Sequence, residues 1–563
     1  MAKINEQIIN NIKRNLNESD EINTNVFVLF ELLLNHINYK PNESWINSDR
    51  LIISNKYKIV LNEMNKYFSK KMDVESAMIG DVLGTATGIA LGERYLSNLV
   101  KESNPKLDLI SFNTFCVCDS DDLLSGCAYE SLSFAGFQKL NKLIILCQIN
   151  EDEKRNNSNE NLLDRFMGID FEVIEVKNIL SSSTLANAIE EAKNSKKPTI
   201  IIYKTKKMKV KELEGEIVLD SVKEHIAKVT EKRLNKKIAK WEETKNNAGS
   251  QSIEEIIKLL ENKKTSVEFQ SSNFKLGDNY NESLKVSGQK MFNILAKKSK
   301  FILSIFNDLN SVCKINNTEI MNKNNPVARN IYVGSRNNSI GYIANGLASL
   351  GFKVFLSSKL TNSTFFLPAI KQSINYKYPV TYIFEGSGED MDIFRNIPNL
   401  ITFRPADINE IIGTYEIVNN LEHSTVIVLN DAIIKKIELT NPRYVLAGAY
   451  RVLKESEQLH GTIIATGSEV SLALEVAKEL LNYGVNLRVT SMPSKKLFYR
   501  QSEKYRNSLI PKTLPIFVIE FGNTIWREFT NEEYIFSNKT INTKENIIEK
   551  IIELLKKETI RHE

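Results

Sequence analysis

Short apolar runs typical of buried strands recur along this chain, separated by segments with helical periodicity. Strands that alternate with helices favour parallel sheets, because each helix carries the chain back to the edge where the next strand starts. The sequence therefore predicts an α/β protein whose largely parallel sheets are flanked by helices. The clearest runs are Thr114–Val117, Leu143–Ile149, Thr199–Tyr203, Phe301–Ile305, Ile331–Val333, Lys353–Leu356, Val380–Phe384 and Thr425–Leu429.

The length of the chain, 563 residues, exceeds what one hydrophobic core usually supports. We expect a first α/β domain over residues 1–245 and a second over 273–440. A polar, Lys/Asn/Glu-rich linker over 246–272 separates them, and a third domain covers 441–563. An apolar helix is predicted over Asn25–Ile37.

The stretch from Ile331 to Gly346 combines a strand, a tight turn at Gly334 and a helix rich in Ile, Ala and Gly. Ligands of α/β proteins usually bind at such junctions, where the carboxyl end of a strand meets a helix. This stretch is therefore the first candidate for a functional site.

Bulk composition excludes several classes of protein. The net charge is only +5 and is spread along the chain, so neither nucleic acid nor a membrane surface is required as a partner. The sequence has no apolar run of about 18 residues and no signal-peptide pattern at its start. Five cysteines, an odd number without disulfide-type spacing, favour a reducing environment. We expect a cytoplasmic protein.

The candidate stretch contains Gly334, Arg336 and the run Ala344-Asn345-Gly346. This pattern resembles the pyrimidine-domain motif of transketolases, Gly-x-Arg-Glu-x-Gly followed by an Ala-Asn-Gly helix. Further similar blocks follow in family order over nearly the whole chain, the most specific being Gly461–Pro511. The resemblance implies a thiamine-diphosphate-binding type of fold with a transketolase C-terminal domain.

Transketolase-like enzymes bind thiamine diphosphate between the first domain of one subunit and the second domain of its partner. A Mg²⁺ ion bridges the diphosphate to oxygen ligands of the protein. The resemblance places the metal loop on Asp119 and Ser120, with Asn150 at the position of a further ligand. The family has Gly-Asp-Gly where this chain has Asp119-Ser120-Asp121, so an acidic turn that caps a helix is the favoured interpretation over metal binding.

The family's catalytic glutamate has become Asn337. An amide donates a hydrogen bond but transfers no proton, so Asn337 orients a cofactor ring at most. The resemblance leaves Asp308, Gly334 and Arg336 as remnants of a cofactor site. Asp308, judged alone, is also a plausible first residue of a helix.

Sugar phosphates are handled in the family by a histidine cluster and an arginine. This chain has five histidines, none of them in a catalytic motif. Asp431 stands where the phosphate-binding arginine is expected, which would repel a dianion.

Two other candidates remain open on the residues alone. Cys116, Cys118 and Cys127 could bind zinc, but a buried strand end is the favoured interpretation. The Gly467-Ser468-Glu469 turn could hold an anion, but a helix cap is favoured.

We therefore predict a transketolase-like protein with a degenerate ketol-transfer site. It would be a pseudoenzyme that works by association, as a homodimer or as a heterodimer with a transketolase paralogue. The alternative is a divergent active enzyme that uses thiamine diphosphate and Mg²⁺ to move two-carbon ketol units between sugars of the pentose phosphate pathway. A sugar phosphate is a partner only in that case. A third possibility is a split site that a partner chain completes.

Overall fold

The computed structural model describes residues 2–16, 19–40, 45–68, 74–75, 80–149, 161–206, 219–274, 277, 280–387, 391–522, 525–539 and 541–562. The chain forms two compact units. The first unit comprises residues 1–264, 319–328 and 335–352, and the second comprises 265–318, 329–334 and 353–563. Each unit is described by itself.

The first unit contains a parallel sheet with the strand order β2-β1-β3-β4-β6-β5. The predicted strands at 114–117, 143–149 and 199–203 are confirmed. The sequence does not predict β1, β2 or β5, because these strands are short or interrupted by charged residues. The strands are β1 Arg50–Ile53, β2 Val74–Glu75, β3 Thr114–Asp119, β4 Leu143–Ile149, β5 Glu172–Val176 and β6 Thr199–Lys204.

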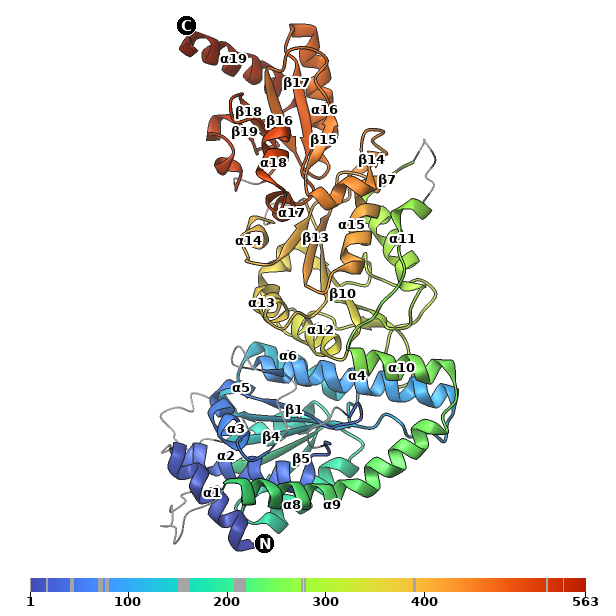
Figure 1. Ribbon diagram of the computed structural model, residues 1–563, viewed down its shortest axis with the longest axis vertical. Helices are drawn as coiled ribbons and strands as arrows, with labels where there is room; N and C mark the ends of the chain where they lie inside the picture. Colours follow the sequence, from blue (N-terminus) through green and yellow to red (C-terminus); the bar gives the residue numbers. More distant parts are fainter. Residues whose placement is uncertain are drawn as a thin grey trace. The chain divides into compact units, whose positions relative to one another are not determined.

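Helices cover both faces of this sheet (Figure 1). A large core joins one face of the sheet to the helices on that side, through residues such as Phe30, Phe115 and Tyr203. These helices are α1 Ala2–Leu16, α2 Asp20–Glu31, the π-helical turn η1 Leu32–His36, α3 Lys58–Met64, α8 Ser182–Asn194 and α9 Leu219–Asn246. The predicted helix over Asn25–Ile37 is confirmed, although it widens into the π-helical turn η1 at its end. The other helices of this part are α4 Asp81–Ser103, α5 Ser120–Leu123, α6 Gly126–Phe137, α7 Leu162–Gly168 and α10 Gln251–Asn262, with the short 3-10 turn η2 Asn55–Tyr57.

The segment over 335–352 belongs to the first unit and carries α12, Ile340–Ser349. Helices α4 and α12 approach at glycines, because a Cβ on Gly88 or on Gly346 would overlap backbone atoms of the other helix. The Ala344-Asn345-Gly346 run of the sequence is thus a helix-packing surface. All three of its residues are buried.

The second unit contains another parallel sheet, ordered β12-β13-β11-β10-β8-β9. The predicted strands of this region are all confirmed to within a few residues. Its strands are β8 Ile302–Phe306, β9 Asn330–Tyr332, β10 Lys353–Lys359, β11 Val380–Glu385, β12 Ile401–Phe403 and β13 Thr425–Leu429. Its helices are α11 Leu284–Ala296, α13 Leu367–Asn375, α14 Met391–Arg395 and α15 Ile408–Asn420, with the 3-10 turns η3 Ser271–Asn273 and η4 Leu360–Phe366. An antiparallel ribbon of β7 Asn281–Ser283 and β14 Ile433–Lys435 lies in the same unit.

A third sheet, ordered β15-β17-β16-β18-β19, completes the second unit. Only β15 is antiparallel to its neighbour. The elements are β15 Tyr450–Leu453, β16 Gly461–Ala465, β17 Leu487–Ser491, β18 Ile516–Ile519, β19 Ile535–Phe536, α16 Glu469–Leu480, α17 Lys495–Tyr499, α18 Glu503–Leu509 and α19 Lys544–His562, with the 3-10 turns η5 Pro442–Ala447, η6 Leu481–Tyr483, η7 Ile525–Glu528 and η8 Glu532–Tyr534.

The predicted fold class, parallel sheets flanked by helices, is confirmed. The predicted domain boundaries stay predictions, since the two compact units follow spatial packing and assign 335–352 to the first unit. Among the described helices, none is long and apolar enough to cross a membrane.

Candidate functional site

Asp119 is the last residue of strand β3, at the carboxyl edge of the first sheet. It is also the N-cap of helix α5. Its Oδ1 accepts hydrogen bonds from the backbone N–H groups of Asp121 and Asp122, each at 3.0 Å. The Asp122 carboxylate accepts in return from the backbone N–H of Asp119 at 3.3 Å, which completes a capping box. The favoured interpretation of an acidic helix cap is confirmed for Asp119. Ser120 is the first residue of α5 and is buried.

The second oxygen of Asp119 pairs with a lysine. The Lys56 Nζ lies 2.8 Å from Asp119 Oδ2. Asp122 Oδ1 accepts from the backbone N–H of Gly80 at 2.9 Å. Burial and then the negative charge of Asp119 raise the pKa of Asp122 to about 6.

Neutral polar side chains fill the neighbouring strand ends. The Gln148 Oε1 accepts from Tyr57 Oη at 2.9 Å and also from the Asn25 amide. The Tyr203 hydroxyl donates to Asn25 Oδ1 at 2.7 Å, and Gln148 Nε2 donates to Thr205 at 2.9 Å. Each of these polar groups forms hydrogen bonds within the protein, so the side chains at this edge of the sheet form a self-contained network.

The described residues of this edge do not fit a Mg²⁺ ion that bridges a diphosphate. Such an ion needs several free oxygen ligands, whereas Asp119 is committed to a helix cap and an ammonium group. No cluster of three His, Cys, Asp or Glu side chains suited to a metal occurs in the described part of the chain. Asn150 lies outside the described residues, so its predicted role as a ligand stays a prediction.

The turn that precedes α12 is held by helix α6 of the same unit. Glu130 accepts from the Asn338 amide at 2.7 Å and from the backbone N–H of Ser339 at 2.9 Å. The guanidinium of Arg336 donates to Ser133 Oγ at 2.9 Å. Asn337 is half-buried in this turn. The structure thus gives Arg336 a packing contact on α6, and its predicted cofactor contact stays a prediction.

Gly334 and Asp308 lie in the second unit, after β9 and β8. Gly334 has φ +63°, a conformation that glycine adopts without strain, so its match to the family pattern has a backbone reason. The interpretation of Asp308 as a helix start is wrong. Asp308 is followed by a turn, in which its carboxylate accepts from the backbone N–H of Asn310 at 2.9 Å.

Asp308 belongs to a cluster of four charges at the carboxyl ends of β8, β10 and β11. Lys359 lies opposite Glu385 in the strand register, with its Nζ 3.2 Å from Glu385 Oε2 and 3.6 Å from Asp308 Oδ2. Lys285 of α11 approaches the same Glu385 oxygen at 2.6 Å. The other Glu385 oxygen accepts from the backbone N–H of Val312 at 3.1 Å. We call these four side chains the Lys285–Asp308–Lys359–Glu385 cluster.

The pKa shifts agree with this pairing. The Asn310 N–H and then the Lys359 charge hold the pKa of Asp308 below its usual value. Burial lowers the pKa of Lys359, but the charges of Glu385 and Asp308 outweigh burial and raise it overall. Both shifts favour the charged forms of Asp308 and Lys359, in agreement with their ion pair.

The remaining candidates have structural roles. Burial, followed by the charge of Lys193, lowers the pKa of His36 to about 4, so this histidine is neutral at physiological pH. Cys116, Cys118 and Cys127 are free and buried, which confirms the favoured interpretation as core residues. Ser468 precedes α16 but makes no capping hydrogen bond, so the cap prediction is wrong in its detail. Its hydroxyl accepts from Asn430 at 2.9 Å.

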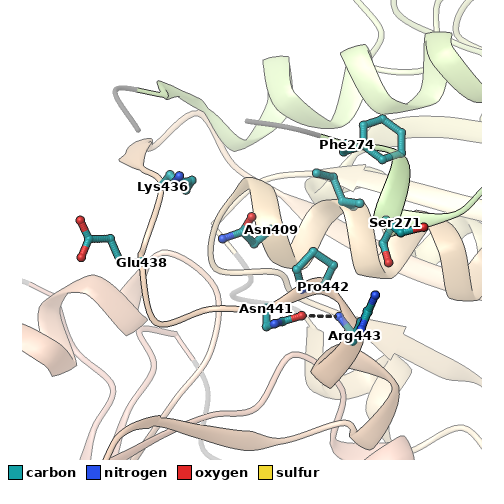
Figure 2. Close-up of a pocket in the computed structure, with 10 residues that line it drawn as sticks. Ser271, Phe274, Asn409, Lys436, Glu438, Asn441, Pro442 and Arg443 are labelled. Carbon is teal, nitrogen blue, oxygen red and sulfur yellow. Dashed lines mark hydrogen bonds between the residues drawn. The ribbon is translucent and has the colours of Figure 1, made fainter. Parts of the chain in front are cut away.

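A pocket of about 540 Å³ opens in the second unit between η3, α15 and the loop that leads into η5 (Figure 2). Asn409, Lys436 and Arg443 contribute polar groups to its wall, beside the ring of Phe274. The Asn441 side chain accepts from the backbone N–H of Arg443 at 3.0 Å. None of the site residues predicted from the sequence lines this pocket.

The parallel sheets, their helical cover and a separate C-terminal sheet define the class of the protein. It is an α/β protein with a thiamine-diphosphate-binding type of fold and an additional C-terminal domain. Residues 63–210 match the family model "Transketolase, thiamine diphosphate binding domain", and residues 448–540 match the model "Transketolase-like TK C-terminal domain". Both models describe transketolase domains, so the chain is similar to transketolases over these two regions.

Relatives agree with this assignment. The chain is 28% identical over 500 residues to a probable transketolase of Streptococcus pneumoniae, covering 79% of this chain and 75% of the relative. It is 27% identical over 587 residues to a transketolase of Mycoplasma genitalium, covering 90% and 89%. Solved transketolases of Leishmania mexicana (TM-score 0.85, 19% identity, 98% and 97% covered) and Campylobacter jejuni (TM-score 0.80, 22% identity, 98% of each chain) share the fold.

The sequence identifies Asp119 and Asp308 as candidates, but it does not identify the lysines that pair with them. The sequence predicts no role for Lys56, Lys285 or Lys359. A lysine at the end of a strand, next to a strand that ends in an acid, was the available signal. It becomes specific only when the strand order is known.

Proposed function

We propose that this protein is a transketolase-like pseudoenzyme that works by association with a second protein chain. The observation that carries the proposal is the Lys56–Asp119 ion pair, at 2.8 Å, where the family pattern places a metal loop. An ammonium group on this carboxylate supplies the positive charge that a divalent ion would otherwise contribute. The protein neutralises Asp119 without a cofactor.

The second support is the replacement of acid–base groups. Asn337 stands at the position of the family's catalytic glutamate, and an amide has no proton to transfer near neutral pH. The Lys285–Asp308–Lys359–Glu385 cluster pairs its own charges at the strand ends that follow β8, β10 and β11. The absence of the catalytic glutamate acts against ketol transfer. The pairing of the charged side chains at the strand ends with one another acts against it as well.

A specific observation favours the alternative as well. Residues 63–210 match the thiamine diphosphate binding domain of the family, and Gly334 and Arg336 are retained. A divergent enzyme that binds the cofactor through other contacts would use this domain. Its substrate would be a sugar that donates or accepts a two-carbon ketol unit.

Thiamine diphosphate with Mg²⁺ is expected not to bind at micromolar concentration, because the charges at both strand edges are already paired. Isothermal titration calorimetry on the full chain measures this directly, with a complete transketolase as the positive control. A ketol-transfer assay with xylulose 5-phosphate and ribose 5-phosphate runs in parallel. Binding with a micromolar Kd, or measurable transfer, would refute the pseudoenzyme proposal and support the divergent enzyme.

The split-site possibility has a separate outcome. If the cofactor binds only after a complete transketolase paralogue is added, in excess of what the paralogue binds alone, the two chains share a site. If the mixture binds no more cofactor than the paralogue binds alone, this possibility is rejected.

Association is supported by apolar side chains exposed on the first unit. The α6 apolar surface consists of Leu124, Tyr129, Phe137 and Met167, with exposed fractions from 37% to 63%. Gly136 packs against the backbone of Ile169, so α7 lies beside the end of α6. Exposed aromatic and aliphatic side chains often mark interfaces between chains, although the guanidinium of Arg165 lies over the Tyr129 ring at 3.4 Å.

Phe137→Glu is expected to weaken self-association or association with a paralogue by roughly 2 kcal/mol, about 30-fold in Kd, because aromatic side chains dominate interface energies. Analytical ultracentrifugation of the variant over a concentration series measures the shift. Ile541→Glu is the matched control, since Ile541 and Phe137 are both 63% exposed. Equal behaviour of the two variants would remove the α6 apolar surface from the proposal.

A further inference from the structure

The wall of the pocket in Figure 2 has an apolar part and a polar part. The pocket measures about 540 Å³, within the range of about 300–1,000 Å³ that is usual for small-molecule sites. Phe274 and Pro442 contribute rings to its wall, and Ser271, Asn441 and Arg443 contribute polar groups. All five residues belong to the second unit, so the pocket lies within one compact body.

Ser271 is buried, but its hydroxyl group lacks a partner. The residue is only 9% exposed, and its side chain forms no hydrogen bond with the residues that the structure describes. The hydroxyl oxygen nevertheless keeps accessible surface, and Ser271 lines the pocket, so this oxygen faces the pocket and not the core. Buried polar groups in native proteins are almost always hydrogen-bonded. A ligand in the pocket would supply the partner that the surrounding side chains do not.

The guanidinium of Arg443 is a second group without a partner. It forms no ion pair and no side-chain hydrogen bond with the part of the chain that the structure describes. Figure 2 shows the Arg443 side chain on the same side of the pocket as Ser271. Glu438 also belongs to the wall, but it lies beyond Asn409 in this view, with its carboxylate directed away from Arg443. Among the described lining residues, no carboxylate therefore neutralises the charge of Arg443.

Asn441 adds a further donor. Its Oδ1 accepts from the backbone N–H of Arg443 at 3.0 Å, which fixes the amide and leaves its N–H₂ group available. This group has no acceptor among the described residues. A guanidinium, a hydroxyl and an amide thus offer donors to one pocket. A phosphoryl group has three terminal oxygens and nearly two negative charges, so it suits this set of donors better than a carboxylate does.

We propose that this pocket binds a phosphate monoester that carries an apolar group. Arg443 pairs with the phosphoryl oxygens, Ser271 and Asn441 donate hydrogen bonds to them, and the apolar group packs against the Phe274 ring. The proposal does not depend on whether the chain binds thiamine diphosphate, since none of these residues belongs to the predicted cofactor site.

The test uses phenyl phosphate as the probe, because it joins a phosphoryl group to a ring. Isothermal titration calorimetry on the full chain measures its Kd at about pH 7.5, where the ester is mostly a dianion. Benzoate keeps the ring but carries a carboxylate, and inorganic phosphate lacks the ring. These two compounds separate the contribution of the phosphoryl group from that of the apolar group.

We expect phenyl phosphate to bind with a Kd below about 1 mM, and benzoate and inorganic phosphate to bind at least about fivefold more weakly. Arg443→Gln weakens binding of the ester by about tenfold or more, because a charged donor is lost. Ser271→Ala weakens it by about fivefold, since a neutral donor contributes less. Arg527→Gln is the matched control and binds like the wild type, because Arg527 is exposed and lies outside the pocket.

Three results would overturn the proposal. The first is the absence of binding heat up to about 5 mM phenyl phosphate. The second is equal affinity of Arg443→Gln and Arg527→Gln, which would assign the ester to another site on the chain. The third is equal binding of benzoate, which would show that the pocket does not select a phosphoryl group. Thermal melts verify that the variants are folded, and Arg443→Gln alone decides the outcome if Ser271→Ala does not fold.

Discussion

Gly346→Ala is expected to lower the free energy of unfolding of the first unit by about 3 kcal/mol, at the upper end of the cost of over-packing. The added Cβ would overlap the carbonyl oxygen of Thr85 and lie 2.9 Å from the Cα of Gly88. Both atoms belong to the backbone of α4, so no side-chain rotation relieves the clash. The helices must separate, and the buried surface between them is lost.

Urea denaturation followed by circular dichroism measures this effect. Gly168→Ala is the matched control, because no atom lies within 4 Å of the position of its Cβ. Alanine is also the better helix former, so Gly168→Ala is expected to leave stability unchanged or to raise it by up to about 1 kcal/mol. If both variants unfold at the same urea concentration, the close approach of α4 and α12 is not a source of stability.

Arg404→Met is expected to destabilise the second unit by about 3–5 kcal/mol, because it leaves buried carboxylates without their counter-ion. The Arg404 guanidinium lies 2.7 Å from Glu469 Oε2 and 3.0 Å from Glu520 Oε1. It also donates to the carbonyl oxygens of Thr466 at 3.0 Å and Ser387 at 2.7 Å. Glu520 keeps a second partner in Arg395, so Glu469 bears most of the loss.

The defect of Arg404→Met is expected to depend on pH. Burial raises the pKa of Glu469 even with Arg404 in place, and removal of the guanidinium raises it further. A carboxyl whose folded pKa exceeds its unfolded pKa loses stability as pH rises between these two values. The variant should therefore lie closer to the wild type at pH 5 than at pH 8.

Thermal unfolding at both pH values measures this difference. Arg527→Met is the control, because the Arg527–Glu532 pair is exposed, at 60% and 76%, and such pairs contribute about 0–1 kcal/mol. A defect of Arg404→Met that is as small as that of the control, or that grows toward pH 5, would contradict the interpretation of a buried ion network.

Much of the fold could be predicted from the sequence because its strands are continuous apolar runs. The predicted and observed bounds agree to the residue for two strands, Leu143–Ile149 and Thr425–Leu429. Strands buried on both faces carry this signal, whereas β5, with the sequence Glu-Val-Ile-Glu-Val, is half-exposed and was missed. The antiparallel ribbon of β7 and β14 was missed for the same reason, since half of its residues are exposed and the others are half-buried.

The candidate site was predicted less completely. The resemblance to the family motifs singled out Asp119, Asp308 and Asn337, although Asp119 and Asn337 differ from the family's residues at their positions. The lysines that pair with Asp119 and Asp308 could not be found in that way, because Lys56 and Lys359 are distant from them in sequence. A side-chain pair forms where the strand register and the helix packing bring two residues together.

The sequence by itself indicated the similarity to transketolases and the parallel α/β architecture, and it predicts that Asn337 stands at the position of a catalytic glutamate, because these are properties of local pattern and residue identity. Only the tertiary structure decided which side chains pair with the carboxylates at the carboxyl ends of the strands. A lysine satisfies Asp119 and a four-charge cluster satisfies Glu385, since a buried carboxylate requires a counter-ion wherever the fold places it. The tertiary structure also decided that Ala344-Asn345-Gly346 is a packing surface, because the contact between α4 and α12 joins residues far apart in the chain.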